Sequence, residues 1–256
     1  MMQRRKLIVV FYSAMALFFL GCNSEDASDC FQNAGDLQQV EVALPNFTKI
    51  TVFEQLNLVL KQGPEQKVVI ESGEYLLNEI SAEVEEGRLI VQNENGCNLL
   101  RDYALSTVYV TAPNIEEIRS STGLTISSDG VLSYPTLRLV SESFINPDTE
   151  TTDGSFELDL NTTTVSIVVN GIAYFNLKGN STNLDITIAA GDTRIEAQEL
   201  ITTNVNLNHR GSNDILVNPQ ERLIGVIRGY GDVLSFNRPE TVRVTEEFRG
   251  KLIFKD

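Results

Sequence analysis

The chain has 256 residues, and its 35 Asp and Glu outnumber its 20 Lys and Arg, for a formal net charge of −15. A surface this acidic repels phosphate backbones, which excludes nucleic acid as a partner and disfavours simple adsorption to anionic lipid. The chain has no Trp, the commonest stacking residue of sugar-binding clefts, and its length accommodates one extended β domain or two compact ones.

Residues 1–21 have the pattern of a lipoprotein signal peptide. The basic stretch "MMQRRK" precedes fourteen uncharged residues, "LIVVFYSAMALFFL". As a helix these would span about 21 Å, less than the ~30 Å core of a bilayer, which favours a secretory signal over a spanning anchor. The stretch ends in "FLGC", which resembles a bacterial lipobox, so we predict lipidation of Cys22. Ordinary signal cleavage near Gly21 is the alternative.

Residues 22–38 are polar and acidic, and we interpret them as a solvated tether. The segment "NSEDASD" after Cys22 is similar to the acidic export signal that sends some Bacteroidetes lipoproteins to the outer face of the outer membrane. We therefore expect an outer-membrane lipoprotein of the cell envelope, attached to the membrane by lipid alone. Exposure at the cell surface and a periplasmic orientation both stay open.

Lipidation of Cys22 would leave two cysteines, Cys30 and Cys97. An even remainder in an oxidising compartment predicts one disulfide, which would connect the end of the tether to the "NENGCN" turn. Closing a loop of that size is worth about 4 kcal/mol if chain entropy alone is counted. Two buried free thiols are the alternative, and the sequence has no CxxC pattern of a zinc or redox site.

From residue 39 the chain alternates apolar and polar residues in short runs bounded by Gly, Asn, Asp and Pro, which is the pattern of β-strands. Clear examples within 39–112 are "FTKITV", "LNLVLKQG", "KVVIES", "RLIVQN" and "TVYVTAP". We predict an N-terminal β region over 39–112, which is either a distinct subdomain or the first coils of the stack that follows.

Residues 113–256 contain a repeat of about twenty positions. Predicted strand starts follow one another at intervals of 19, 21, 18 and 19 residues, and fall at Val165, Leu184, Val205, Leu223 and Val242. Each is followed by a glycine, at Gly171, Gly191, Gly211, Gly229 and Gly250, and four residues later by a large apolar residue, at Phe175, Ile195, Ile215, Val233 and Phe254. Apolar residues at a fixed interval indicate stacked coils with one inward column. We predict an all-β fold, a β-helix or β-solenoid-like stack.

The recurring glycine is expected to adopt a positive φ at one corner of each coil. Gly123 has the same place in an earlier coil, "NIEEIRSSTGLTISSDGVLS". An acidic segment with few apolar residues interrupts the pattern at 141–155, and we predict an inserted loop there. Insertions on stacked coils can host binding sites, although an acidic loop of this kind can also be merely solvated.

The phrases "RGSNDILV" and "RGYGDVLS" repeat an Arg and an Asp in adjacent coils. Asp214 and Asp232 precede an inward apolar position by one residue, so their side chains should point outward. The same outward position holds Tyr174 and Arg194 in preceding coils. We interpret this column as a solvated ladder. The alternative is a surface-binding site formed by Arg194, Arg210, Asp214, Arg228, Tyr230 and Asp232.

No metal site is expected, because calcium would need several converging oxygen ligands and two carboxylates on adjacent coils are too few. The single histidine, His209, precedes Gly211 by two residues, in a column with Val169, Ala189 and Ile227. We interpret His209 as an interior or corner residue that bonds to the backbone, rather than as a catalytic or zinc-binding residue.

Three segments of the β region are similar to one known family. They are "FTKITVFEQLNLVLKQG", "VYVTAPNIEEIRSSTG" and the corner-glycine coils that end in "RGYGDVLSFNRPETVRVTEEFRGKLIF". Over roughly 40–255 the sequence resembles the putative auto-transporter adhesin, head GIN domain family, common in lipoproteins of Bacteroidetes. The resemblance implies an all-β, β-helix-like fold and exposure in the envelope, and it supplies no catalytic residue.

The main functional hypothesis is a non-catalytic, adhesin-like envelope lipoprotein that binds a glycan or protein at the cell surface through an extended β surface. A structural or accessory component of an envelope complex is the alternative. A polysaccharide-degrading β-helix enzyme is a third; hydrolysis needs two carboxylates about 5–9 Å apart, for which Asp214 and Asp232 are the available pair. We expect no catalytic residue and no cofactor.

Overall fold

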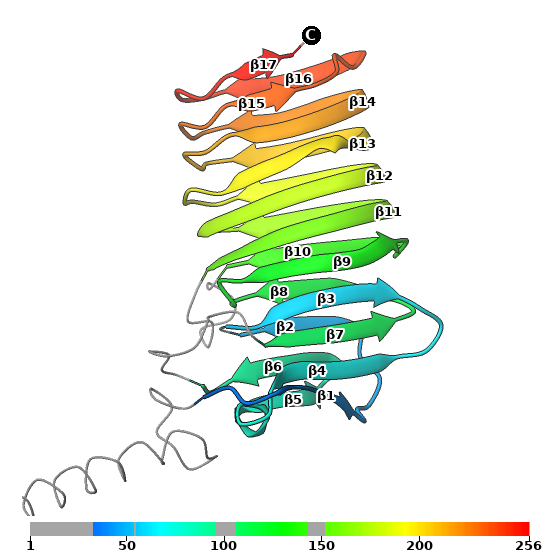
Figure 1. Ribbon diagram of the computed structural model, residues 1–256. Helices are drawn as coiled ribbons and strands as arrows, with labels where there is room; N and C mark the ends of the chain where they lie inside the picture. Colours follow the sequence, from blue (N-terminus) through cyan, green and yellow to red (C-terminus); the bar gives the residue numbers. More distant parts are fainter. Residues whose placement is uncertain (1–32, 54, 96–105, 143–151, 256) are drawn as a thin grey trace, which may run out of the picture.

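The computed structural model describes residues 33–53, 55–95, 106–142 and 152–255. The strands in these ranges belong to one 17-stranded sheet, which curls round an apolar interior into a nearly closed, barrel-like body (Figure 1). The described ranges contain no α-helix and one short 3-10 turn, η2 (Leu77–Glu79). The prediction of an all-β protein is therefore confirmed.

The strands range from three to seventeen residues. Their bounds are β1 Leu37–Val42, β2 Lys49–Val52, β3 Asn57–Gln62, β4 Lys67–Gly73, β5 Ile80–Glu85, β6 Arg88–Asn93, β7 Thr107–Ala112, β8 Glu117–Ser120, β9 Thr125–Leu132, β10 Thr136–Ser141, β11 Asp153–Val169, β12 Ile172–Ile188, β13 Arg194–His209, β14 Ile215–Ile227, β15 Val233–Ser235, β16 Thr241–Glu246 and β17 Leu252–Phe254.

The pairing divides the sheet into two ladders that run the length of the body. Ladder A follows the order β1, β4, β7, β3, β9, then the first halves of β11, β12, β13 and β14, then β15 and β17. Ladder B follows the order β5, β6, β2, β8, β10, then the second halves of β11 to β14, then β16. Only the pairs β1–β4, β4–β7 and β5–β6 are antiparallel among the described strands.

The predicted register of the strand starts is confirmed. Val165, Leu184, Val205, Leu223 and Val242 are paired in series in ladder B. In ladder A, Phe175, Ile195, Ile215 and Val233 are likewise paired in series, and all four are fully buried. Repeats of nearly equal length therefore bring equivalent apolar side chains side by side on neighbouring strands.

The assignment of Phe254 to this column was wrong. Val233 pairs with Leu252, and Phe254 pairs with Ser235 instead. The reason is the length of the last corner: Leu252 comes two positions after Gly250, whereas Val233, its partner, comes four positions after Gly229. Phe254 is partly exposed, with the Arg238 guanidinium 3.8 Å from its ring centre.

The corner glycines are required mainly by close contact between coils. A Cβ atom on Gly171 or Gly229 would lie 2.0 Å from the carbonyl oxygen of Thr152 or Gly211 in the preceding coil, well inside van der Waals contact. Positive φ was predicted for all of these corners, and it is found at Gly191 (+100°) and Gly123 (+68°). For Gly171, Gly211, Gly229 and Gly250 that prediction was wrong.

The order of the coils along the body differs from their order in the chain. Strand β2 lies between β6 and β8 in ladder B, and β3 lies between β7 and β9 in ladder A. Strands β2 and β3 are therefore paired on one side with β6 and β7 and on the other with β8 and β9. The first half of the chain and the repeated coils thus share both ladders.

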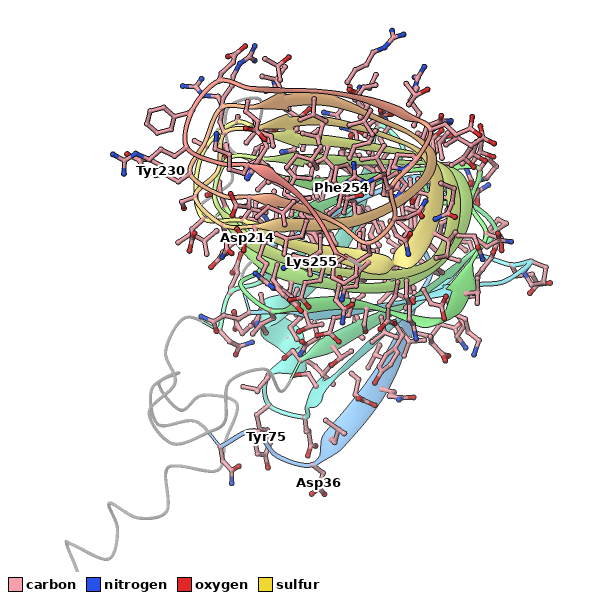
Figure 2. All side chains as sticks on the ribbon, turned by 90° about the horizontal axis from the view of Figure 1, so that it is seen from above. Asp36, Tyr75, Asp214, Tyr230, Phe254 and Lys255 are labelled. Atoms are coloured by element: carbon pink, nitrogen blue, oxygen red, sulfur yellow. The ribbon has the colours of Figure 1, made fainter. Side chains whose placement is uncertain are left out.

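The interior is a continuous apolar cluster from Phe47 to Val233. Near its middle, the rings of Phe156 and Phe175 stack with centres 4.7 Å apart and planes 3° from parallel. One buried ion pair adjoins the cluster, between Arg119 and Glu142 at 2.9 Å. Seen from the C-terminal end, the ribbon follows one closed outline round this interior (Figure 2).

Candidate ligand-binding surfaces

A hollow lies on the outer face of ladder A and crosses β9, β11, β12 and β13. It has a volume of about 700 Å³. Its walls consist mainly of hydrogen-bonding side chains: Ser127, Ser128, Glu157, Asp159, Asn176, Lys178, Glu196, Gln198 and Glu199. We call this hollow the groove. Its residues come from four neighbouring strands, so it extends along the stack.

Irregular pairing coincides with the groove in successive strands. The register shifts between Glu157 and Asp159 where β11 meets β9, and between Asn176 and Lys178 where β12 meets β13. A further shift follows Ala197 where β13 meets β14. An extra residue in one strand bends it and interrupts the regular pleat. These bulges place the polar side chains of the groove on a surface that is not flat.

The groove is acidic, with one cation. Lys178 lies 3.5 Å from Asp159, whereas the carboxylates of Glu157 and Glu199 are exposed. Glu196 accepts hydrogen bonds from the Tyr174 hydroxyl at 2.6 Å and the Arg194 guanidinium at 2.7 Å. Both bonds lower the pKa of Glu196, that from Tyr174 most, and the bond to Glu196 raises the pKa of Tyr174. Glu196 therefore stays ionised at neutral pH, and the groove favours ligands rich in hydrogen-bond donors.

The repeated aspartates bind the backbone of the next coil. Asp214 Oδ1 accepts a hydrogen bond from the Asp232 N–H at 2.9 Å, and Asp232 Oδ1 accepts one from the Lys251 N–H at 2.7 Å. These bonds satisfy donors at a corner where the ladders are interrupted. The two carboxylates thus have a structural role in holding successive corners together.

The arginines of the same motif pair with glutamates rather than with these aspartates. Arg228 Nε contacts Glu247 at 2.7 Å, which lowers the pKa of Glu247, and Arg194 contacts Glu196. Arg210 is exposed at its corner. Of the six residues of the predicted surface site, Arg194 begins β13, and the other five lie in the corners that follow β13 and β14.

Tyr230 is the exposed aromatic residue of this edge, with 60% of its surface accessible. Its ring meets that of Phe248 edge to face, with centres 5.0 Å apart, and the Arg249 guanidinium lies 5.5 Å from its centre. In Figure 2 the Tyr230 side chain projects from the side of the last coils. An exposed aromatic pair of this kind offers contact area at little entropic cost.

His209 is fully buried, in a column with Ile188 and Ile227. We predicted Ala189 at the position of this column that Ile188 occupies. The prediction was wrong because the corner before Arg194 is one residue longer than the neighbouring corner, so that counting back from its glycine gave the wrong residue. Nδ1 accepts a hydrogen bond from the Gly211 N–H at 3.3 Å, and Nε2 has no hydrogen-bond partner among the described residues.

Burial lowers the pKa of His209, and this is the largest influence on it. The backbone of Gly231 and Asn213 and the carboxylates of Asp214 and Asp232 act in the opposite direction. A buried neutral imidazole with apolar neighbours above and below has no access to a substrate. His209 is accordingly a core residue of this structure.

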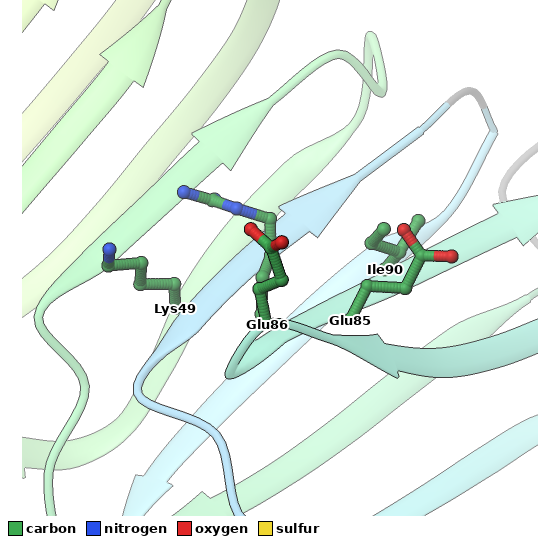
Figure 3. A pocket seen from close by; sticks show the side chains of 5 residues that line it. Lys49, Glu85, Glu86 and Ile90 are labelled. Atoms are coloured by element: carbon green, nitrogen blue, oxygen red, sulfur yellow. The ribbon is translucent and has the colours of Figure 1, made fainter.

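A smaller hollow, of about 460 Å³, lies near the N-terminal end of the body (Figure 3). Lys49, Glu85, Glu86, Arg88 and Ile90 line it. Glu86 and Gly87 both have positive φ and form the two-residue turn of the β5–β6 hairpin, as a primed turn requires. The strained backbone of Glu86 is therefore explained by the turn. Mixed charges and a shallow form make this hollow a weaker candidate than the groove.

In the described ranges, no three His, Asp or Glu side chains come together in a way that could hold a metal ion. Within the same ranges, no helix has the length and apolar character needed to cross a membrane.

Comparison with known families identifies the domain. Residues 46–239 match the family described as putative auto-transporter adhesin, head GIN domain. The chain belongs to this family. The matched range includes the groove, His209 and both copies of the Arg–Asp motif, so all of these lie within the head GIN domain. No curated protein matches the chain.

Solved structures share the fold of this head GIN domain at low sequence identity. A putative adhesin from Bacteroides fragilis NCTC 9343 has 17% identity and a TM-score of 0.75, with 86% of this chain and 97% of that chain covered. A putative adhesin from Parabacteroides merdae ATCC 43184 has 15% identity and a TM-score of 0.60, covering 87% and 97%. A putative lipid binding protein from Parabacteroides distasonis ATCC 8503 has 14% identity and a TM-score of 0.60, covering 87% and 98%.

Three predicted residues, Cys22, Cys30 and Cys97, lie outside the described residues. Most of the predicted inserted loop, 143–151, also lies outside them. The groove of the head GIN domain was not predicted. One signal for it was present, since the interval of 21 residues between Leu184 and Val205 is longer than its neighbours and contains the extra residue of the β13 bulge.

Proposed function

We propose that this head GIN domain protein is a non-catalytic, adhesin-like protein of the cell envelope that binds a glycan through the groove. The observation that carries the proposal is the groove itself, a hollow of about 700 Å³ that crosses four neighbouring strands and has hydrogen-bonding walls. A chain of sugars lying along the stack would contact side chains from successive coils.

The charge of the groove indicates the class of glycan. Glu157, Glu196 and Glu199 offer acceptors for hydroxyl and ammonium groups, and Lys178 is the cation among the groove residues named above. Uronates and sulfated sugars would be repelled by these carboxylates. We therefore propose a neutral or amino-bearing glycan. A lipid tail would need an apolar cavity, and both hollows described above have predominantly polar walls.

A glycan array divided into neutral, amino-bearing and acidic sugars tests this proposal. The mature chain with Cys22→Ser, which prevents lipidation, is expected to retain only neutral or amino-bearing glycans. Glu199→Gln removes one groove carboxylate without changing its size and is expected to weaken binding at least tenfold. The matched control is Glu221→Gln, an exposed glutamate of β14 outside the groove, which should leave binding within twofold.

Absence of binding throughout the array would count against the proposal, as would binding that all groove substitutions leave unchanged. A polysaccharide-degrading role is disfavoured, because Asp214 and Asp232 use their Oδ1 atoms to bind the backbone of the next coil. An Asp232→Asn variant that folds normally but turns over a polysaccharide at a different rate from the wild type would support that role.

We further propose the envelope organisation predicted above. Residues 1–21 would be the signal peptide, Cys22 the lipidated residue, 22–38 the tether, whose last two residues begin β1, and Cys30 and Cys97 a disulfide. Labelling with a radioactive fatty acid that Cys22→Ser abolishes would support the anchor. For the disulfide, equal alkylation of the chain before and after reduction would contradict it.

The repeated coils over 113–256, including the inserted loop at 141–155, would form a β-solenoid, with 39–112 as the N-terminal β region. The parallel register of ladders A and B supports this proposal. A crystal structure with coils that do not follow this register would contradict it.

A further inference from the structure

We propose that the C-terminal end of the body is a second binding site, which accepts an extended acidic strand of a partner protein along the free edge of β16. We call residues 228–255 the tip. The site is separate from the groove and makes no use of groove residues. Three features of the tip support it.

The first feature is an unpaired edge. β16 pairs with β14 on one side, and β17 pairs with β15 on one side. The pairings of the described strands give neither of them a second neighbour. β16 has six residues, long enough for alternate backbone N–H and C=O groups to bind an added strand. A glycan has no matching row of main-chain donors and acceptors, so the edge favours a polypeptide.

The second feature is an incompletely covered apolar column. Val242 lies over Leu223, and Leu252 is its counterpart in ladder A, where it lies over Val233. Val242 is 38% exposed and Leu252 is partly exposed, whereas Leu223 and Val233 are fully buried. Each interior coil is covered by the coil above it, and the tip coil has none. A strand added to β16 would cover Val242 and the partly buried Val244. Alternate apolar side chains on the added strand would suit this surface.

The third feature is charge. The tip contains six Lys and Arg and four Asp and Glu, so the rest of the chain contains the remaining 14 and 31. A positive end on an otherwise strongly acidic protein attracts an acidic partner and repels the positive end of another copy. Arg243 is exposed in the middle of β16, next to the free edge. Glu246 and Glu247 are already paired, with Lys251 and Arg228.

A second copy of the chain is less suited as the occupant. Pairing of the β16 edges of two copies would bring two positive tips together, which their charge disfavours. The other free edge strands of a second copy, β1 and β5, lie at the opposite end of the body (Figure 1). If the lipid anchor proposed above is present, that end faces the membrane and is out of reach of another copy's tip in the same membrane. Self-association is therefore an outcome that the experiment must detect.

The first experiment measures fluorescence anisotropy of a labelled seven-residue peptide that alternates Glu with Val, titrated with the mature Cys22→Ser chain. Binding is expected to saturate and to weaken at least tenfold when Lys replaces each Glu of the peptide. Arg243→Glu should weaken it at least tenfold. Arg210→Glu makes the same change of charge at an exposed corner outside the tip, and should leave it within twofold.

A second form of the experiment covers weak binding in solution. The same peptide is fused to the C-terminus through a short Gly-Ser linker, which raises its effective concentration to the millimolar range. The fused strand should raise the Tm by several degrees and slow amide hydrogen exchange in β16, and a fused Lys-for-Glu strand should do neither.

Three results would overturn the proposal. One is no binding in solution together with no effect of the fused strand, and a second is equal binding of the Glu and Lys peptides. The third is concentration-dependent self-association in sedimentation that Arg243→Glu abolishes, which would assign the edge to a second copy. Glu199→Gln should leave peptide binding unchanged, so failure at the groove and failure at the tip are distinguishable.

Discussion

The two ends of the body differ in how the apolar face of the terminal coil is covered. At the N-terminal end the strand direction reverses, and β4 and β5 cover the last parallel strands as antiparallel neighbours. Val68, Ile70 and Ile80 are buried there as part of the core cluster. At the C-terminal end the parallel ladders stop at β16 and β17, and equivalent apolar residues are partly exposed. The reversal is what closes the core, because an end coil otherwise lacks the neighbour that covers its apolar face.

The largest expected effect contrasts the middle of the stack with the tip. Phe175→Ala removes a fully buried ring that stacks on Phe156, and should lower the free energy of unfolding by about 3–5 kcal/mol. Phe254→Ala removes the same side chain at the tip, where it is partly exposed, and should cost about 1 kcal/mol or less. Urea unfolding followed by circular dichroism measures both. Equal losses would mean that the tip is as well packed as the middle.

The two ends themselves are compared by one substitution at each. Ile70→Ala in β4 empties a buried position and should cost about 2–4 kcal/mol. Val242→Ala in β16 shortens a side chain of the inward column that is 38% exposed, and should cost less than about 1 kcal/mol. A loss at Val242 as large as that at Ile70 would show that the C-terminal end is covered, and would remove one support of the proposed strand site.

A corner glycine inside the stack should be less tolerant than one at the tip. Gly229→Ala places Cβ 2.0 Å from the Gly211 carbonyl oxygen, between coils that are held on both sides, and should cost about 1–3 kcal/mol. Gly250→Ala makes a similar contact with Gly231, but the last coil is free to move outward, so the cost should be under about 1 kcal/mol. Hydrogen exchange in β17 should then accelerate in Gly250→Ala alone. Faster exchange throughout the stack in that variant would be contrary evidence.

The same difference between regular and irregular segments explains what the sequence could predict. Coils of nearly equal length put equivalent residues in register, so the columns at Val165 and Phe175 followed from spacing alone. The errors fall where a coil is longer or shorter: the corner that precedes Arg194 and the corner that precedes Leu252. A position that is predicted by counting residues from a glycine is wrong when the count crosses an inserted or missing residue. The sequence alone does not show on which side of the glycine that residue lies.

The arrangement of the N-terminal half could not be predicted for a different reason. β2 and β3 lie between strands that come later in the chain, and the alternating pattern of "FTKITV" fits any parallel neighbour equally well. The groove depends on bulges in three pairings at once, and a single sequence does not reveal which coil faces an extra residue. The Asp214 and Asp232 carboxylates were expected to face solvent. Instead, each accepts a hydrogen bond from a backbone N–H group of the next coil.

The smallest expected effect concerns one column that runs from the interior to the tip and holds His209, Ile227 and Glu246 in series. Burial lowers the pKa of His209, so between its folded value and the unfolded value of about 6.5 the unfolded state binds a proton that the folded state does not. Stability should therefore fall as pH decreases below about 6.5, by up to ~1.4 kcal/mol per pH unit.

His209→Ile matches its neighbours in the column and should abolish this loss between pH 7.5 and 5. Glu246 is the matched control because it is exposed at the tip end of the same column. Hydrogen bonds from the Leu252 N–H, and then from Lys251, lower the pKa of its carboxyl group. Glu246→Gln should therefore leave the dependence of stability on pH unchanged over this range. Urea midpoints at each pH measure the slopes. If stability depends on pH as steeply in His209→Ile as in the wild type, the acid sensitivity belongs to another group. His209 would then be in contact with water. That result would contradict the closed interior that distinguishes the middle coils from the tip.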